Sequence, residues 1–471
     1  MNRTVPLVLA VALFMEQMDS TVIATALPAI ASDIGTSPIA LKLALTAYLV
    51  ALAIFIPISG WMADRFGAKR VFTIAIAVFM IGSIACAVSS SLAQFVLSRF
   101  LQGMGGAMMT PVGRLVLVRS TQKSDLVNAL AWLTIPALIG PLAGPPVGGF
   151  LTTFLSWHWI FLINIPIGIA GIAFALALLP VDTTSQADRV DWTGFMLAGA
   201  AASGIVFGLS VISLPALPPA WGVAATAAGA VALVVYFVHA RRTPNPLLNP
   251  KLFANRSFAA AATGANLFRI GAGAVPFLLP LMLQLGFGLS PFRSGMITFV
   301  SAGGALTMKF IVRAILRAGG FRLVLIGAAA GAAVSIAVNG LFTPATPVWL
   351  IMIVLFSSGL VRSLFFTSAN ALVFADIADG DTAQATAMTA AMQQVAIAVG
   401  VAVAGGILDI VTQIEGGALT LRAFHIAFFA VSAISALAII PFLFMPRNAG
   451  EAVSGHAIGR AGARAASPVR D

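Results

Sequence analysis

The sequence predicts an all-α integral membrane protein, and its composition and its long apolar runs carry that prediction. Hydrophobic residues make up 60% of the 471 residues and charged residues only 9%, against roughly 45–50% and 25% in an average globular protein. A soluble core cannot enclose that much apolar surface, so the mean hydropathy of +1.02 places most of the chain in lipid. The apolar runs lack the alternation of β-strands, which favours a helical bundle over a barrel.

Apolar runs long enough to cross a membrane recur along the whole chain. At about 20 residues for each crossing, the sequence divides into fourteen predicted spanning helices. The first is expected to stay in the mature protein, because Glu16 and Asp19 interrupt its apolar run and a signal peptide would not carry them. The predicted spans are 6–28, 43–63, 71–91, 93–118, 128–152, 158–180, 193–213, 220–240, 257–285, 292–317, 322–342, 347–374, 384–411 and 423–445.

Lysine and arginine residues divide unevenly between the two sets of connections. About seventeen lie at one set of helix ends, whereas the other set holds only Lys42, Arg293 and Arg422. By the positive-inside rule, both termini are expected in the cytoplasm, as an even number of crossings requires. The net charge of +11 is then a topology signal whose partner is anionic lipid headgroups, and a nucleic-acid partner is not expected.

A weak internal repeat predicts the domain organisation. Arg65, Gly67 and Arg70 recur as Arg317, Gly319 and Arg322 at one common offset, although Leu316 stands where Asp64 would repeat. Parallel repeats of this kind mark secondary transporters, with a substrate site where the halves meet. We therefore expect a six-helix bundle at 1–180, two inserted helices with their linkers at 181–256, a second bundle at 257–446, and a disordered cytoplasmic tail at 447–471.

Several kinds of chemistry are excluded by what the chain lacks. The single cysteine, Cys86, rules out an intramolecular disulfide, and four scattered histidines make a metal site unexpected. The chain has no Walker-type phosphate loop, so ATP is not expected to drive it. No hydrolytic cluster of serine, histidine and acid is visible. We expect a monomer that is not an enzyme, needs no cofactor, and takes its energy from a proton gradient.

The order of the motifs resembles the major facilitator superfamily, in particular its fourteen-spanner drug:proton antiporter family. GWMADRFGAKR (60–70) is similar to the signature loop, LSRFLQGMGGA (97–107) to the arginine-bearing motif, and GPLAGPPVGG (140–149) to the antiporter motif. MDSTVIATALP (18–28) and WHWIFLINIPIG (157–168) resemble further hallmarks of that family. The sequence departs from the pattern at Ala131, where the longer antiporter motif has glycine. The resemblance implies a major facilitator fold of two six-helix bundles plus two inserted helices.

The resemblance also implies roles for two glycine-containing segments. In the signature loop, Asp64 would latch the cytoplasmic side, while glycines would allow close helix approach and a tight turn; topology and folding alone could also explain the basic residues. In the antiporter motif, removal of side-chain bulk would give a tight seam that closes the outer side and suppresses leak. The residues concerned are Gly60, Asp64, Arg65, Gly67, Lys69 and Arg70 in the loop, and Gly140, Gly144, Pro145, Gly148 and Gly149 in the motif.

Buried charges on the first helix indicate the coupling site. Glu16 and Asp19 lie three residues apart and therefore share a face. A charge within a span is costly and normally has a function, and two neighbouring carboxyls suit proton transfer. Arg99 is the expected countercharge, and the family motif assigns it to proton transfer. A structural ion pair with Arg99, or a water-exposed position at the outer end, remains an alternative for the two acids.

The second half of the chain carries basic residues within its spans. Arg269, Lys309 and Arg362 are candidates for a substrate cavity, together with Asp409 as the only deep acid there. A basic lining would favour anionic or zwitterionic substrates, whereas the acids of the first helix would favour cations, and the sequence contains both signals.

These observations predict a proton-coupled antiporter in the cell membrane that exports amphipathic drugs or similar small compounds by alternating access, a function linked to antibiotic resistance. A dedicated transporter of one native metabolite is the alternative, and a transport-inactive receptor is a rival of a different class.

Overall fold

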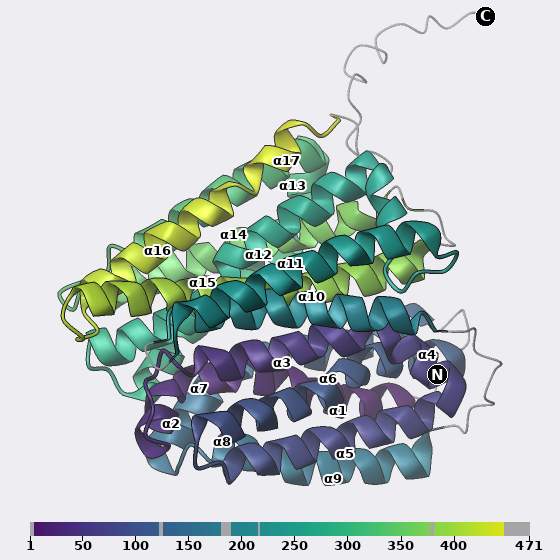
Figure 1. The fold of residues 1–471 in the computed structure, drawn as a ribbon, viewed down its shortest axis with the longest axis horizontal. Coiled ribbons are helices and arrows are strands. Elements are labelled where there is room, and N and C mark those ends of the chain that lie inside the picture. The colour runs from purple at the N-terminus through teal and green to yellow at the C-terminus, as the bar shows by residue number, and fades with distance from the viewer. Residues whose placement is uncertain are drawn as a thin grey trace, which may run out of the picture.

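The computed structural model describes residues 4–121, 126–179, 190–214, 217–375, 377 and 381–446, with no side-chain description for 126–138 and 383. Helices and their connecting turns make up this part of the chain (Figure 1). The helices are α1 (Thr4–Val22), η1 (Ile23–Thr25), α2 (Leu27–Asp33), α3 (Lys42–Phe55), η2 (Ile56–Ile58), α4 (Ser59–Phe66), α5 (Ala68–Ala87), α6 (Leu92–Ser120), α7 (Leu126–Phe154), α8 (Trp159–Leu162), α9 (Asn164–Leu178), α10 (Trp192–Val211), α11 (Pro219–Arg242), η3 (Pro250–Ala254), α12 (Arg256–Leu281), η4 (Met282–Gly286), α13 (Pro291–Asn339), α14 (Val348–Ala375), α15 (Thr382–Ile414), α16 (Leu421–Ala436) and α17 (Ile439–Leu443).

The described helices provide the fourteen crossings that the sequence predicts. Eleven of them are, by their length and composition, long and apolar enough to span a membrane. One of these, α13, runs for 49 residues and is broken at Gly320, so it crosses twice. The remaining crossings are α6 and α7, with 29 residues each, because a helix of that length exceeds the hydrocarbon thickness.

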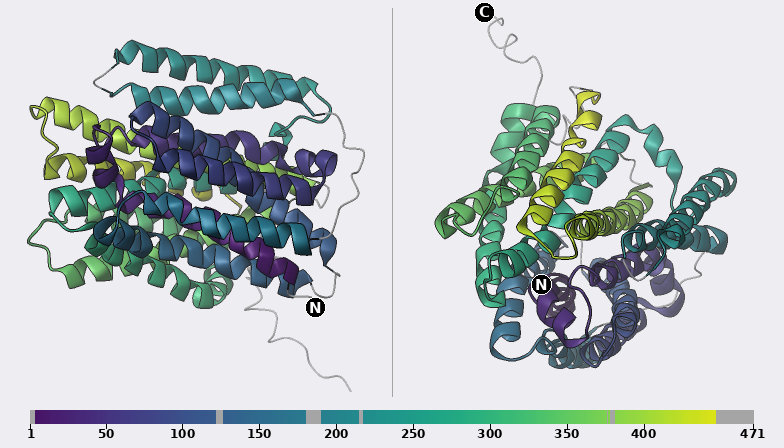
Figure 2. Two further views of the ribbon diagram at one scale, coloured as in Figure 1. Left: turned by 90° about the horizontal axis from the view of Figure 1, so that it is seen from below. Right: turned by 60° about the vertical axis from the view of Figure 1, so that its left-hand side comes forward.

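The helices gather in two groups beside an additional pair. In Figure 1, α1 to α9 occupy the lower part of the molecule and α12 to α17 the upper part. The pair α10 and α11 packs together along its length, and α10 contacts α3 on one side and α15 on the other (Figure 2). The two large groups meet mainly where α7 packs on α13 and where α3 packs on α15.

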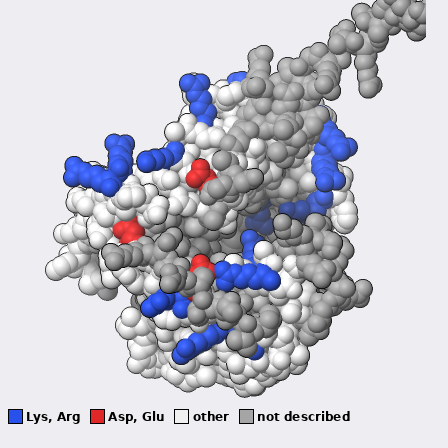
Figure 3. Space-filling view, turned by 90° about the vertical axis from the view of Figure 1, so that its right-hand side faces the viewer, with Lys and Arg blue, Asp and Glu red and all other residues white. Residues whose placement is uncertain are grey.

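One end of the bundle, here called the basic end, collects the positively charged turns. Asp64 of α4 contacts Arg119 at the end of α6, and Arg322 of α13 donates to the carbonyl of Leu443 in α17. Figure 3 looks onto this end and shows lysine and arginine side chains around its rim with few acids among them. Helix α1 begins and α17 ends here (Figure 1).

The two predicted repeat turns have related but not identical geometry. Gly67 ends α4 with φ 86°, and Gly320 breaks α13 with φ 64°. Only glycine adopts such angles at low cost, which explains a glycine in both turns. The common offset in the sequence pairs Gly67 with Gly319, whereas the residue with positive φ in the second turn is the next one, Gly320.

At the basic end, Asp191 joins the two members of the α10–α11 pair. Its carboxylate accepts from the Gly194 amide and so caps α10, and it also lies 2.7 Å from Nε2 of His239 on α11. Burial opposes ionisation, but these hydrogen bonds and a third from the Leu247 amide outweigh it and hold the pKa of Asp191 below its usual range. The charged carboxylate therefore stabilises the pair at neutral pH.

Candidate functional site

Asp19 on α1 is the centre of a buried polar network between α1, α5, α6 and α9. Its side chain is fully buried, and one carboxylate oxygen lies 2.7 Å from Arg99 Nη1. The other oxygen accepts from Gln102 Nε2 and from Asn164 Nδ2, each at 2.8 Å. Ser83 Oγ accepts from the same two amides. Three donors therefore hold one carboxylate, and they come from two helices other than its own.

Arg99 is held on two aromatic faces in addition to its ion pair. Its guanidinium carbon lies 4.3 Å from the ring centroid of Tyr48 on α3 and 5.8 Å from that of Phe161 on α8. Only 1% of the side chain is exposed. A buried charge pair of this kind is costly to break on one side only, because the remaining charge is then uncompensated.

Glu16 lies next to this network, on the same helix. Its carboxylate accepts from Gln17 Nε2 at 2.8 Å and from Thr110 Oγ1 at 3.1 Å. Both donors are neutral, so Glu16 differs from Asp19 in having no arginine against it among the described contacts. The two acids share the face of α1 that the sequence predicts, but they have different partners.

The signature loop connects α4 to α5 at the basic end. Asp64 forms an ion pair with Arg119 of α6, and both side chains are about one-third exposed. Lys69 Nζ donates to the carbonyls of Leu176 and Leu179 at 2.7 Å each, and so caps the last turn of α9. Arg65 and Arg70 are exposed.

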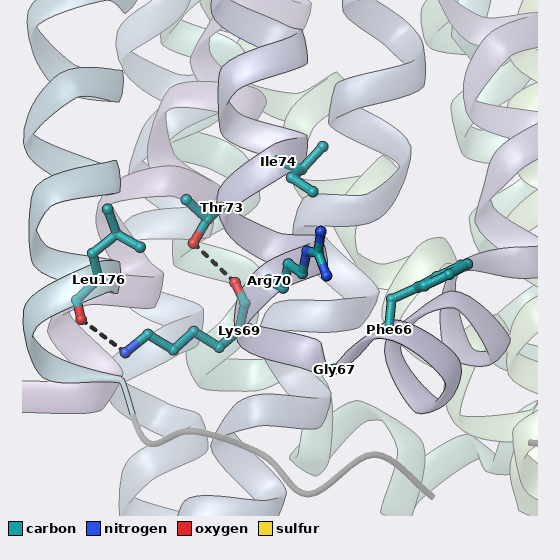
Figure 4. A pocket seen from close by; sticks show the side chains of 7 residues that line it. All are labelled: Phe66, Gly67, Lys69, Arg70, Thr73, Ile74 and Leu176. Atoms are coloured by element: carbon teal, nitrogen blue, oxygen red, sulfur yellow. Dashed lines mark hydrogen bonds between the residues drawn. The ribbon is translucent and has the colours of Figure 1, made fainter. Parts of the chain in front are cut away.

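Lys69 also lines a surface pocket of about 390 Å³ between α5 and α9. Figure 4 shows the Lys69 side chain extended to the carbonyl of Leu176, whereas the Arg70 side chain points away from Leu176. Gly67 makes the tight turn that the sequence predicts. Gly60 does not show the expected close helix approach, because it is exposed and no atom lies within 4 Å of the place a Cβ would take.

The glycines of the antiporter motif form two seams along α7. A Cβ on Gly144 would lie 2.0 Å from Thr21 Oγ1, and one on Gly148 would lie 2.3 Å from the Val22 carbonyl, both on the α1 segment. Gly140 approaches α1 at Gln17 in the same way. On the other seam, a Cβ on Gly149 would lie 2.5 Å from the carbonyl oxygen of Pro291 in α13.

The seam with α13 is also tight from the other side. A Cβ on Gly295 would meet the Pro145 carbonyl oxygen at 2.2 Å, and the Phe292 amide donates to Thr153 Oγ1 at 3.1 Å. Nearby, Gln284 Nε2 donates to the Thr25 carbonyl. Segments η1, α7, η4 and α13 are therefore packed closely at the end opposite the basic end.

Asp409 occupies a second buried ion pair at that opposite end. Its carboxylate lies 2.5 Å from Lys42 Nζ at the start of α3, and Ser213 Oγ, just past α10, contacts both groups. Lys42 is fully buried. Sequence reasoning treats Lys42 as a loop residue and Asp409 as a possible cavity acid. The structure instead joins them near the end of the bundle, and no described contact links Asp409 to Arg269, Lys309 or Arg362.

The three predicted cavity cations converge on α14. Arg269 of α12 donates to Asn370 Oδ1 at 3.1 Å, with its guanidinium carbon 5.1 Å from the Phe366 ring centroid. Lys309 of α13 donates to Thr367 Oγ1 at 2.7 Å. Arg362 lies on α14 itself, half-buried.

Sequence reasoning finds the Asp19–Arg99 pairing and misses most of its surroundings. It assigns no role to Gln102, Asn164, Ser83 or Tyr48, although each is a polar or phenolic residue within an apolar span, which is the available signal. Arg119, the partner of Asp64, is likewise counted only as a topology residue. Ala131 lies where side chains are not described.

Comparison with known proteins agrees with this architecture. Residues 9–338 match the model of the Major Facilitator Superfamily. A Klebsiella pneumoniae protein named "Putative multidrug resistance protein MdtD" is 36% identical over 449 residues, which cover 94% of each chain. An Escherichia coli O139:H28 protein of the same name is 35% identical over 453 residues, which cover 95% of each chain.

Solved structures confirm the fold. A D-xylose-proton symporter superposes with a TM-score of 0.70 at 13% identity, covering 95% of this chain and 98% of its own. The nucleoside transporter NupG superposes with a TM-score of 0.61 at 17% identity, covering 95% of this chain and 100% of its own. The fourteen crossings and the named relatives agree with the resemblance to the fourteen-spanner family. The chain therefore belongs to the Major Facilitator Superfamily, as a multi-pass membrane transporter of small molecules and not an enzyme.

Proposed function

We propose that the protein is a proton-coupled antiporter that exports amphipathic organic compounds from the cell by alternating access. The relatives named for multidrug resistance support export, and their bacterial sources support a location in the inner membrane. The uneven charge distribution supports cytoplasmic termini, with the basic end facing the cytoplasm. Residues 1–180 and 257–446 are the two moving bundles in this proposal, and 181–256 contributes the α10–α11 pair.

The observation that carries the proposal is the buried contact between Asp19 and Arg99. Protonation would discharge the carboxylate and remove the partner of Arg99. Because Gln102 and Asn164 bind the same carboxylate, the change would weaken contacts from α6 and α9 to α1 together. A proton could in this way bias the balance between inward- and outward-facing states.

Glu16 supports a two-acid version of this coupling. It lies one turn before Asp19, where its hydroxyl and amide donors can adapt to either protonation state. In the proposal, Glu16 either shares the proton with Asp19 or tunes it, and titration of such a pair belongs to both groups.

The gating loop and the antiporter motif complete the proposal. In this proposal the α7–α13 seam closes the outer side, and the close contacts of Gly149 and Gly295 support that role. The loop contacts two helices at the proposed cytoplasmic side. Asp64 pairs with Arg119 of α6, and Lys69 donates to carbonyls at the end of α9. Movement of the loop would then be transmitted to α6 and α9.

The coupling proposal is tested with Asp19→Asn in proteoliposomes. We expect proton-driven substrate accumulation to be lost while substrate exchange persists, because exchange requires the cavity but no net proton movement. Asp33→Asn is the matched control: Asp33 lies on α2 at the opposite end, where it accepts from Trp157 and is more than half exposed. Glu16→Gln is expected to be milder if Glu16 only tunes Asp19. Full coupling to the pH gradient in the Asp19, Glu16 and double variants would falsify the proposal.

A further inference from the structure

The upper group of helices carries Arg269, Lys309 and Arg362 within its spans, and the described contacts of Arg269 and Lys309 are with neutral groups. Arg269 contacts the amide of Asn370 and the ring of Phe366, and Lys309 contacts the hydroxyl of Thr367. Thr367 and Asn370 lie three residues apart on α14, so their side chains are neighbours at about 5–6 Å between Cβ atoms. The side chains of Arg269 and Lys309 therefore contact adjacent positions of α14.

Arg362 extends this cluster along the same face of α14. Arg362, Phe366 and Asn370 are spaced by four residues each and form one stripe. The stripe is half-buried at Arg362 and Phe366 and exposed at Asn370. An arginine directed at hydrocarbon costs at least about 2.5 kcal/mol on insertion scales, so charged residues in spans normally face the bundle interior. The stripe therefore belongs to an interior surface.

The acids that could neutralise these cations are engaged elsewhere. Within the described spans, Asp19 is paired with Arg99 and Asp409 with Lys42. Glu16 accepts from Gln17 and Thr110 on the other group of helices. Asp19 and Asp409 are thus neutralised by their basic partners, whereas these three cations of α12, α13 and α14 have no described acidic partner. Arg269 is buried and Arg362 half-buried. A charge buried without a counterion is strongly destabilising, so this surface favours an anionic ligand.

Aromatic rings lie beside the cations. Phe366 stacks under the Arg269 guanidinium, and the ring of Phe268 lies 4.0 Å from that of Phe365, centroid to centroid. Phe268 also meets Phe366 edge-to-face at 5.1 Å. Phe268 and Phe365 are fully buried, so they pack against the half-buried Phe366, which is the ring that a ligand can contact. A ligand that carries an acid group on an apolar or aromatic body would match both this ring and the cations.

We propose that Arg269, Lys309 and Arg362 form the substrate site, and that the substrate class is amphipathic organic anions, held by their carboxylate or sulfonate group. This inference deepens the proposed export function and rests on it. Lys309 is exposed and Arg362 half-buried, so these two provide the accessible charges. Arg269, with only 6% of its surface exposed, lies against the Phe366 ring.

The test is equilibrium binding of two dyes with one ring system to the purified full-length protein in detergent. Carboxyfluorescein is anionic and tetramethylrhodamine methyl ester is cationic, and fluorescence anisotropy reports both. We expect carboxyfluorescein to bind at least about tenfold more tightly, and Arg362→Gln, Lys309→Gln and Arg269→Gln each to weaken it by about tenfold or more, as loss of a charge-assisted contact implies. Arg293→Gln is the matched control, because Arg293 is an exposed arginine at the other end of the same span of α13.

Two further variants separate a ligand role from a structural one. Arg362→Lys keeps the charge and is expected to retain most carboxyfluorescein binding, whereas Arg362→Glu is expected to reverse the preference toward the cationic dye. Tighter binding of the cationic dye by the unmodified protein, binding of neither dye, or unchanged carboxyfluorescein affinity in all three glutamine variants would overturn the proposal. The binding measurement in detergent involves no proton gradient, so its result does not depend on the outcome of the coupling test in proteoliposomes. The anion-site proposal and the proton-coupling proposal can therefore fail independently.

Discussion

At the scale of single residues, burial decides how much each ion pair contributes. Asp19–Arg99 and Lys42–Asp409 are almost completely buried, whereas Asp64–Arg119 is more than one-third exposed on both sides. An exposed pair contributes only about 0.2–1 kcal/mol. Removing one partner of a buried pair costs far more, because the other charge is left in a low dielectric. Mutations at the three pairs therefore report on different properties.

Lys42→Met is expected to destabilise the protein by about 3–5 kcal/mol, since Asp409 would remain buried without its counterion. The double variant Lys42→Met/Asp409→Leu is expected to recover most of this loss. Unfolding midpoints in detergent measure both effects. Arg422→Met is the control, because Arg422 is 78% exposed and lies 3.6 Å from Glu415, and its loss should leave the midpoint nearly unchanged. Equal midpoints for Lys42→Met and Arg422→Met would contradict the assignment.

Asp64→Asn is expected to change the free energy of unfolding by no more than about 1 kcal/mol, because the pair with Arg119 is exposed. In the gating proposal, substrate turnover nevertheless falls severely, since the loop loses its contact with α6. Turnover in proteoliposomes and membrane insertion are the measurements, with Arg119→Gln as the variant that removes the other partner. Normal turnover in both variants would mean that Asp64 only adds polarity to the loop and has no role in gating.

At the scale of elements, the α7–α13 seam depends on backbone contact rather than on side chains. The atom opposite Gly295 is a carbonyl oxygen of Pro145, which cannot rotate away as a flexible side chain would. The α1 face of α7 is equally close at Gly144 and Gly148. Glycines of α7 thus allow close packing on two of its faces, against α1 and against α13. The sequence shows these glycines only as an excess of small residues.

Gly295→Ala is expected to separate α7 from α13 at the opposite end, because the new Cβ would lie about 2.2 Å from a backbone oxygen. The measurement is labelling of Gln284→Cys, a buried position at that end, by a membrane-impermeant maleimide; the native Cys86 is buried and does not compete. We expect faster labelling of the cysteine introduced at position 284 in the Gly295→Ala background than in the variant that carries Gln284→Cys alone. Gly327→Ala is the control, because no atom lies within 4 Å of its Cβ position. A folded Gly295→Ala variant with unchanged labelling would rule out a closing role for the seam.

At the scale of the whole molecule, charge distribution orients the bundle. Basic side chains surround the end where α1 begins and α17 ends (Figure 3), while the described ion pairs of Lys42 and Arg422 lie at the opposite end. Anionic headgroups and the positive-inside rule favour a cytoplasmic position for the basic end. In the proposed function, this orientation places the α7–α13 seam on the outer side.

Both termini are expected to report as cytoplasmic in reporter fusions, and a fusion in the connection between α10 and α11, at 213–219, as external. The physical reason is the excess of lysine and arginine at one set of helix ends. An external C-terminal reporter would mean that the number of crossings is odd and that α13 does not cross twice.

The sequence by itself determined the number and place of the crossings, because hydrophobicity is a local property that a window of 20 residues contains. It also indicated the partner of Asp19, since Arg99 is a basic residue deep in a span of the same half. It could not show that Gln102 and Asn164 share that carboxylate. That arrangement depends on how α1, α6 and α9 pack.

Only the tertiary structure decided the remaining pairings. Lys42 and Asp409 are 367 residues apart, and no local pattern relates them; their contact follows from the packing of α3 on α15. The same holds for Arg269 and Lys309, which meet neighbouring residues of α14 because three helices converge there. Distances between helices come from side-chain packing across the whole bundle, whereas the spans come from each segment alone.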